Sequence, residues 1–151
     1  MFEDFRDFYN QMIVDHSLKP RNFRLLEGAN HSAQGHNPIC GDNIVLYLNL
    51  EGDVIKDISF TGSGCALSTA SASMLTEFAK GKTKADVEKM FSRMRELITT
   101  GVVNGDFGKL SVFSAVHKRP ERVKCAILPW HAVMAALKGE SKPVSTENEE
   151  T

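Results

Sequence analysis

The sequence predicts an α+β fold in which helices pack on one side of a small antiparallel β-sheet. Two neighbouring stretches, residues 42–50 and 54–61, carry strand-like apolar patterns and are joined by a turn at residues 51–53, which is typical of a β-hairpin. Further stretches repeat apolar residues at three- and four-residue steps, which is typical of amphipathic helices. The 151 residues fit one domain, which we place at residues 1–138.

The N-terminal region predicts a helix and one short strand. The helix ends before Pro20, because proline cannot continue a helix. Its apolar face consists of Phe2, Phe5, Phe8, Tyr9, Met12 and Ile13. Residues 21–39 are irregular, with a short strand expected at about residues 29–35. In the first strand of the hairpin that follows, every second residue is apolar and points to the same face of the sheet: Ile44, Leu46, Leu48 and Leu50.

Two helices are predicted after the hairpin. A Gly-Ser-Gly break at residues 62–64 ends the second strand, and a helix of small residues spans about residues 65–80. Gly81 is the expected C-terminal cap of this helix. The next helix spans residues 82–99, and the stretch at 100–119 is mixed in character and interrupted by glycine.

The last helix is expected to begin near Cys125 and to end near Leu137. A start at this point places Pro129 in or just after the first turn, where its missing N–H group costs little. Residues 139–151 are polar and acidic, so we expect a disordered tail.

Charge and composition argue against several classes of protein. The net charge of −1 and the pI near 6.5 provide no positive field, so we expect no nucleic-acid partner. No apolar run approaches the roughly 20 residues of a membrane-spanning helix, so we expect no membrane partner. The N-terminus is acidic and aromatic, unlike a secretory signal or transit peptide, which predicts a cytoplasmic location. In that reducing compartment the three cysteines are not expected to form disulfides.

Each of the three cysteines lies at a predicted boundary between elements. Cys40 lies in a turn before a strand, and Asp42 can direct its carboxylate toward the same place. Cys65 follows two glycines at a helix N-terminus, where the helix dipole favours a thiolate. Cys125 is predicted at another helix N-terminus, beside the cations Arg122 and Lys124, which would lower its pKa.

Two interpretations of these cysteines remain open from the residues alone. Each one could be a buried packing residue, as free cysteines frequently are. Their separations of 25 and 60 residues match no common zinc motif. Three thiolates and one carboxylate are nevertheless a suitable four-ligand set for zinc or for an iron–sulfur cluster.

Five motifs occur in order along the chain. They are DHSLKPRN at residues 15–22, NPICGD at 37–42, GSGCALSTASASM at 62–74, GKT at 81–83 and PERVKCAIL at 120–128. With these motifs the sequence resembles the U-type iron–sulfur assembly proteins, the family of IscU, SufU and the N-terminal domain of NifU. Lys124, where IscU-like members usually carry histidine, and the extra segment at 101–116 resemble the SufU branch.

The resemblance implies a function in iron–sulfur cluster biogenesis. It implies a zinc-dependent sulfur acceptor, similar to a sulfurtransferase, that takes persulfide sulfur from a SufS-type, pyridoxal-phosphate-dependent cysteine desulfurase. Downstream assembly machinery would be a further partner. The alternative is a scaffold that assembles and transfers a [2Fe–2S] cluster on the same ligands.

The resemblance also implies roles for individual residues. Cys40, Asp42, Cys65 and Cys125 would bind the metal or the cluster, and Cys40 would accept the sulfur. Arg122 would lie behind the ligands, with its guanidinium holding the Asp42 carboxylate by a forked hydrogen bond.

Overall fold

The computed structural model describes residues 11–38, 40–139 and 144–145. A helix covers residues 11–18. The elements that follow are β1 (His31–Asn37), β2 (Asp42–Glu51), β3 (Val54–Ser63), α2 (Ala66–Ala79), α3 (Lys84–Thr100), the 3-10 helix η1 (Gly108–Lys118), α4 (Pro120–Lys138) and β4 (Val144–Ser145).

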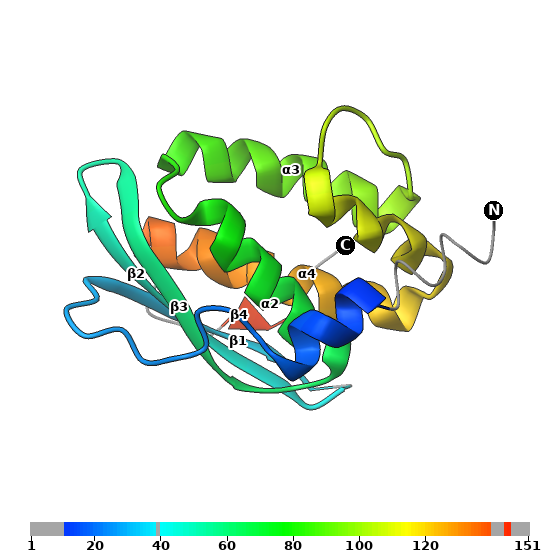
Figure 1. The fold of residues 1–151 in the computed structure, drawn as a ribbon, viewed down its shortest axis with the longest axis horizontal. Helices are drawn as coiled ribbons and strands as arrows, with labels where there is room; N and C mark the ends of the chain where they lie inside the picture. Colours follow the sequence, from blue (N-terminus) through cyan, green and yellow to red (C-terminus); the bar gives the residue numbers. More distant parts are fainter. Residues whose placement is uncertain (1–10, 39, 140–143, 146–151) are drawn as a thin grey trace.

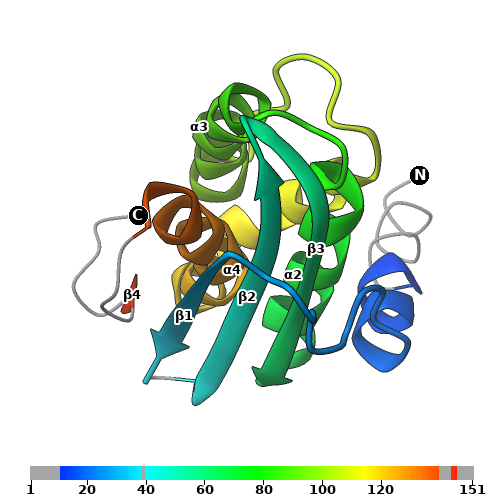
Figure 2. The same cartoon turned by 90° about the vertical axis from the view of Figure 1, so that its left-hand side faces the viewer.

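The strands form one sheet, and the helices lie on one side of it (Figures 1 and 2). The strand order is β3-β2-β1-β4, in which β2 is antiparallel to both β1 and β3, and β4 is parallel to β1. Helices α2 and α4 pack on the sheet, and α3 and η1 form an outer layer against α4. The predicted α+β class and the one-sided packing of the helices are confirmed.

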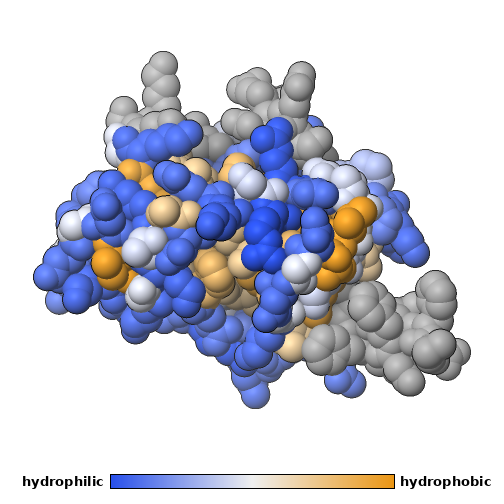
Figure 3. Space-filling view, turned by 90° about the horizontal axis from the view of Figure 1, so that it is seen from above, coloured by the Kyte–Doolittle hydropathy of each residue, from blue (hydrophilic) through white to orange (hydrophobic). Residues whose placement is uncertain are grey.

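The core lies between the sheet and the α2–α4 layer. Its largest fully buried side chains are Trp130, Phe60, Phe113, Ile44, Leu46, Leu48, Ile55, Ile58, Leu75, Met94, Leu97 and Ile98. The predicted alternation along β2 is confirmed, because its even-numbered residues are buried against the helices. The outer face seen from above is mainly hydrophilic, with hydrophobic residues in separate spots (Figure 3).

Helix α4 starts earlier than the sequence predicts. It begins at Pro120 rather than near Cys125, and it runs through Pro129. Proline at a first helical position has the required φ and lacks an N–H group that would have no partner there. An internal proline costs roughly 3 kcal/mol. The buried run Cys125–Val133 packs α4 against β1, β2 and α2, and this burial outweighs that loss.

Strand β1 and helix α4 approach each other closely at Gly35. A Cβ atom at Gly35 would lie 3.0 Å from Cδ1 of Leu128, so a larger residue would require the Leu128 side chain to shift. This approach holds the first half of α4 against the end of β1. It also brings Cys125, one turn before Leu128, to the edge of the sheet where β1 ends.

The C-terminal tail differs in part from the expectation of disorder. Val144 and Ser145 form β4 and pair with Gly35 and His36 of β1, where they cover an otherwise open strand edge. The rest of the tail after Gly139 lies outside the described residues, as does the predicted start of the first helix.

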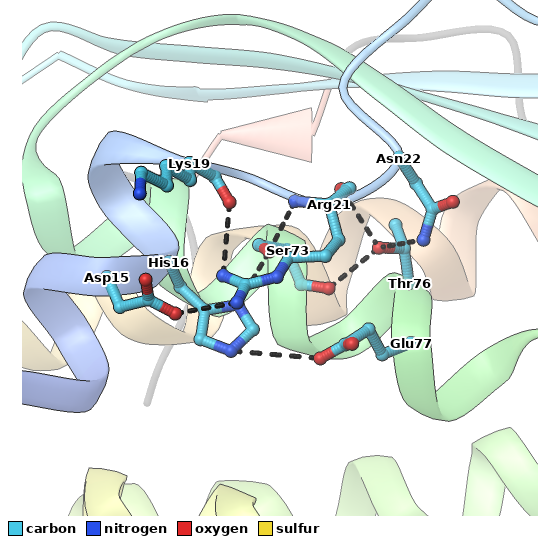
Figure 4. A network of polar contacts seen from close by, with 8 residues as sticks. All are labelled: Asp15, His16, Lys19, Arg21, Asn22, Ser73, Thr76 and Glu77. Carbon is cyan, nitrogen blue, oxygen red and sulfur yellow. Dashed lines mark hydrogen bonds and ion pairs between the residues drawn. The ribbon is translucent and has the colours of Figure 1, made fainter.

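The motif at residues 15–22 anchors the first helix and the segment after it to α2 (Figure 4). His16 is 1% exposed, with Nδ1 2.7 Å from Oγ of Ser73 and Nε2 3.7 Å from a carboxylate oxygen of Glu77. The Ser73 hydroxyl also accepts the backbone N–H of Arg21 at 2.9 Å, so its own proton can be donated to Nδ1 of His16. This arrangement suits the neutral imidazole with its proton on Nε2.

We expect the neutral form of His16 to make the stability of the fold sensitive to pH. Burial lowers the pKa of His16 below 6.5. As the pH falls below about 6.5, the unfolded chain binds a proton at His16 that the folded chain does not, so the free energy of unfolding decreases. The decrease ends once the pH is below the native pKa.

Urea unfolding at pH 7.5, 6.5 and 5.5, with a chelator present, measures this effect. The variant His16→Asn should show a shallower decrease than the wild type. The control His31→Asn changes a partly exposed histidine and should keep the wild-type dependence. An unchanged pH dependence in His16→Asn would contradict the assignment.

Candidate metal centre

Four chain segments meet at one end of the sheet, and each supplies one of the residues that the sequence singled out. Cys40 lies between β1 and β2, and Asp42 is the first residue of β2. Cys65 is the N-cap of α2, directly after β3, and Cys125 lies in the second turn of α4. The antiparallel hairpin and the β3–α2 turn therefore place three of them together, and α4 adds the fourth.

The distances describe a compact donor set. The Cys125 thiol donates to the Cys40 sulfur at 3.1 Å, and all three cysteines are free. One ligand atom from each of Cys40, Asp42 and Cys125 lies within 4.8 Å of the others. Cys65 joins through its backbone N–H, which donates to Oδ1 of Asp42 at 2.8 Å. Within the described part of the chain, no second group of this kind is found.

Asp42 is a fully buried carboxylate that is held from two sides. Besides the Cys65 N–H group, the side-chain amide of Asn37 donates to Oδ2 at 3.3 Å. Gly64 makes room for it, because a Cβ there would lie 2.7 Å from Oδ1 of Asp42. Two hydrogen bonds do not replace the hydration of a buried charge, so a cation at the free lone pairs would stabilise this carboxylate.

Cys65 carries the acidic thiol of the group. The backbone N–H of Ser68 donates to its sulfur at 3.5 Å, as in a helix N-cap. The neighbouring Cys125 thiol, together with the hydrogen bond from Ser68, lowers the pKa of Cys65 to about 6 against the opposing effect of burial. The predicted thiolate at this helix N-terminus agrees with the structure.

Cys125 differs from the prediction. It is fully buried, five residues after the start of α4, rather than at the helix N-terminus. The neighbouring Cys65 thiolate, followed by burial and by the hydrogen bond to Cys40, raises the pKa of Cys125 instead of lowering it. Without metal, Cys125 is therefore the protonated donor of the cluster, and metal binding must displace its proton.

Arg122 is exposed on the first turn of α4. Among the described residues, its side chain makes no hydrogen bond or ion pair, so the forked bond to Asp42 stays a prediction.

Sequence reasoning missed the contribution of Asn37. It is the last residue of β1 and is fully buried, with its amide directed at Asp42 and Cys125. The sequence held a signal for it: Ala33, Gly35 and Asn37 alternate on one face of a strand, and a polar residue at the end of a buried face requires a partner. The predicted strand ended at residue 35, which left Asn37 outside it.

The donor set fits a metal. Cysteine thiolates and a carboxylate are all ligands that zinc accepts, and four of them satisfy its usual coordination number. The same thiolates suit an iron–sulfur cluster. The structure brings together Cys40, Asp42 and Cys125 as a group that could hold either one, and Cys65 as the fourth ligand stays a prediction.

A small α+β domain with thiol and carboxylate donors at one end of its sheet has the form of a metal-binding domain. The chain belongs to the family of NifU-like N-terminal domains, whose model matches residues 8–142. The resemblance to U-type iron–sulfur assembly proteins is confirmed.

The relatives of this chain include proteins named as sulfurtransferases and proteins named as cluster assembly scaffolds. The zinc-dependent sulfurtransferase SufU of Bacillus subtilis is 39% identical over 132 residues, which are 83% of this chain and 86% of that protein. The iron–sulfur cluster assembly scaffold protein IscU of Streptococcus pyogenes is 35% identical over 132 residues, 86% of this chain and 82% of that protein. A crystal structure from Fervidobacterium islandicum, described as an iron–sulfur cluster assembly scaffold for the SUF system, matches with a TM-score of 0.80 and 34% identity over 87% of this chain and 97% of its own.

No described helix has the length and apolar character needed to cross a membrane.

Proposed function

We propose that this protein accepts persulfide sulfur from a pyridoxal-phosphate-dependent cysteine desulfurase of the SufS type, with Cys40 as the acceptor and zinc as the resident metal. The observation that carries the proposal is the unequal burial of the donor set. Asp42 and Cys125 are fully buried, whereas Cys40 and Cys65 are half-buried; of these two, Cys65 is the N-cap of α2 and Cys40 lies on the connection between two strands. The identity with a zinc-dependent sulfurtransferase over most of both chains supports the same function.

The other three donors have positions that favour a fixed role. The Asp42 carboxylate is held by two hydrogen bonds, and the Cys65 sulfur accepts the N–H of Ser68 at the start of α2. Cys125 is enclosed by the core. Zinc, when bound, supplies the positive charge that keeps the thiols deprotonated near neutral pH. Cys40 and Cys65 are both half-buried, but Cys65 is fixed at the start of α2, so Cys40 on the connection between β1 and β2 is the donor we assign as the acceptor.

The transfer itself is an exchange at sulfur. The Cys40 thiolate attacks the terminal sulfur of the persulfide carried by the desulfurase. A new S–S bond forms at Cys40, the S–S bond of the donor breaks, and the cysteine of the desulfurase leaves as a thiolate. Cys40 ends as a persulfide, and no external oxidant or reductant is consumed. A reductant in the assay then releases the transferred sulfur as sulfide.

The second candidate function is a scaffold that assembles a [2Fe–2S] cluster as its cargo. One observation favours it: Asp42 places a hard oxygen donor among soft sulfur donors, and such a mixed set holds a cluster less firmly than four thiolates do. The identity with IscU proteins points in the same direction. The two functions use the same residues and differ in whether iron is required.

Sulfide release by a SufS-type desulfurase, supplied with cysteine and a reductant but no iron, tests the proposal. The wild-type protein should stimulate release strongly, and Cys40→Ser should give no stimulation, because a serine hydroxyl does not attack a persulfide. Ser63→Ala, at an exposed position at the end of β3, should behave as the wild type.

Stimulation by Cys40→Ser equal to that of the wild type would exclude Cys40 as the acceptor. Stimulation by neither protein would favour the scaffold, and anaerobic reconstitution with iron and sulfide would then be expected to produce a coloured cluster.

A further inference from the structure

Asn37 connects two donors that are far apart in the sequence. Its Nδ2 lies 3.3 Å from Oδ2 of Asp42 and 3.5 Å from Sγ of Cys125. The residue is fully buried at the end of β1, where the chain turns toward Cys40. One side-chain amide therefore contacts both a carboxylate and a thiol of the metal centre.

The orientation of this amide follows from its neighbours. If the side chain were flipped, Oδ1 would face a carboxylate oxygen, and two acceptors would repel each other. With Nδ2 toward the donors, Oδ1 is buried and has no hydrogen-bond partner within the described part of the chain. A buried carbonyl without a partner is destabilising, so packing alone does not account for asparagine at this position. The contacts made by Nδ2 do account for it.

The hydrogen bonds of Asn37 are also selective. They reach Asp42 and Cys125, whereas the Cys40 sulfur has the Cys125 thiol as its partner, with no hydrogen bond to the amide among the described residues. A metal ligand that also accepts a hydrogen bond from a neighbouring side chain keeps its orientation when another ligand of the same metal is exchanged. Cys40 has no such support among the described contacts.

We propose that Asn37 is a positioning residue that fixes Asp42 and Cys125 as a permanent pair of metal ligands, which leaves Cys40 as the ligand that can be released. The proposal rests on the zinc site of the proposed function. It explains how a closed set of four donors can contain one reactive member. The amide orients the two buried donors, the Ser68 N–H holds the half-buried Cys65, and the sulfur chemistry occurs at the remaining half-buried donor, Cys40.

Zinc affinity, measured by competition with a chelating dye, and the visible spectrum of the cobalt-substituted protein test the role of Asn37. Asn37→Ala should weaken zinc binding roughly 10- to 100-fold, the usual effect of removing a residue that supports a ligand. Asn37→Asp keeps the shape of the side chain but sets a carboxylate against Asp42. The loss of zinc affinity in this variant should therefore be at least as large as in Asn37→Ala. In both variants the cobalt d–d and thiolate charge-transfer bands should change in position or intensity, because the ligand geometry is no longer held.

Asn43→Ala is the matched control. Asn43 follows Asp42 directly, and its amide oxygen accepts a hydrogen bond from Gln34 on the exposed face of the sheet. Removing this amide should leave the zinc affinity and the cobalt spectrum unchanged. Thermal unfolding of each metal-free variant shows whether the fold is retained; if Asn37→Ala fails to fold, the near-isosteric Asn37→Asp carries the test.

Wild-type affinity in a folded Asn37 variant would overturn the proposal, as would weaker binding with an unaltered cobalt spectrum. A wild-type protein that binds no zinc would instead overturn the proposed metal site, which separates the two failures.

Discussion

Replacing Cys125 by serine is expected to abolish stoichiometric zinc binding while the fold persists. Cys125 is the centre of the donor set: its sulfur donates to the Cys40 sulfur at 3.1 Å and accepts from the Asn37 amide at 3.5 Å, and it lowers the pKa of the neighbouring Cys65. Serine is close in size and keeps a donor for these contacts, but its hydroxyl does not deprotonate near neutral pH to become a zinc ligand. The zinc content should fall from near one per chain to near zero.

Metal analysis after gel filtration measures this loss, and thermal unfolding with and without added zinc supports it. Ligand binding to the folded state raises the unfolding temperature, so zinc should stabilise the wild type and have no effect on Cys125→Ser. Ala132→Ser introduces a hydroxyl at another buried position of α4 and should retain zinc. Stoichiometric zinc in Cys125→Ser would contradict the assignment of Cys125 as a ligand.

Replacing Gly62 by alanine is expected to destabilise the fold by roughly 3 kcal/mol or more. Gly62 has a φ of +129°, and a Cβ there would overlap the backbone oxygen of Asn43 and lie 3.0 Å from Cα of Ile44. Both obstacles are backbone atoms of β2, so no side-chain rotation relieves the contact. The strands would have to separate at the end of the sheet that carries Asp42 and Cys65.

Denaturant unfolding in the presence of a chelator measures the loss without a contribution from metal. Gly28→Ala is the matched control: Gly28 also has a positive φ of +78°, but nothing lies within 4 Å of the point that a Cβ would occupy there. It should lose only about 1 kcal/mol, from the left-handed backbone alone. Similar losses in the two variants would show that the clash at Gly62 is relieved at little cost.

The elements that the sequence predicted well depend on local signals. The β2–β3 hairpin follows from alternation around a glycine turn, and α2 begins directly after the predicted Gly-Ser-Gly break. The start of α3 at Lys84 is marked by a capping box between Thr83 and Asp86. In each case the chain within a few residues carries the information, so the boundaries were accurate to within about two residues.

The same holds for part of the site. Glycine and helix-start signals located Cys65 correctly at an N-cap, but its lowered pKa depends first on the distant Cys125 and only then on the Ser68 N–H group at the start of the helix. The joining of Cys40, Asp42, Cys65 and Cys125 was expected from the family resemblance, because the spacing of the cysteines alone left two interpretations open.

Tertiary structure decided the features that depend on burial. Local rules placed the start of α4 near Cys125 because of Pro129, but packing against β1, β2 and α2 extends the helix back to Pro120. That shift moves Cys125 from a helix end into the core, and burial together with neighbouring thiols reverses the expected direction of its pKa. Desolvation and contacts between distant segments cannot be read from neighbours in the sequence.

For Asn37, too, the sequence determined one part of its role and the tertiary structure the other. The sequence determined that a polar residue precedes the Cys40 turn, but only the approach of α4 to the end of β1 sets its amide between Asp42 and Cys125. The chain's local patterns therefore determined the elements and most of the donor residues. The packing of helices on the sheet decided which donors are buried, which are held by hydrogen bonds from neighbouring residues, and which are only half-buried.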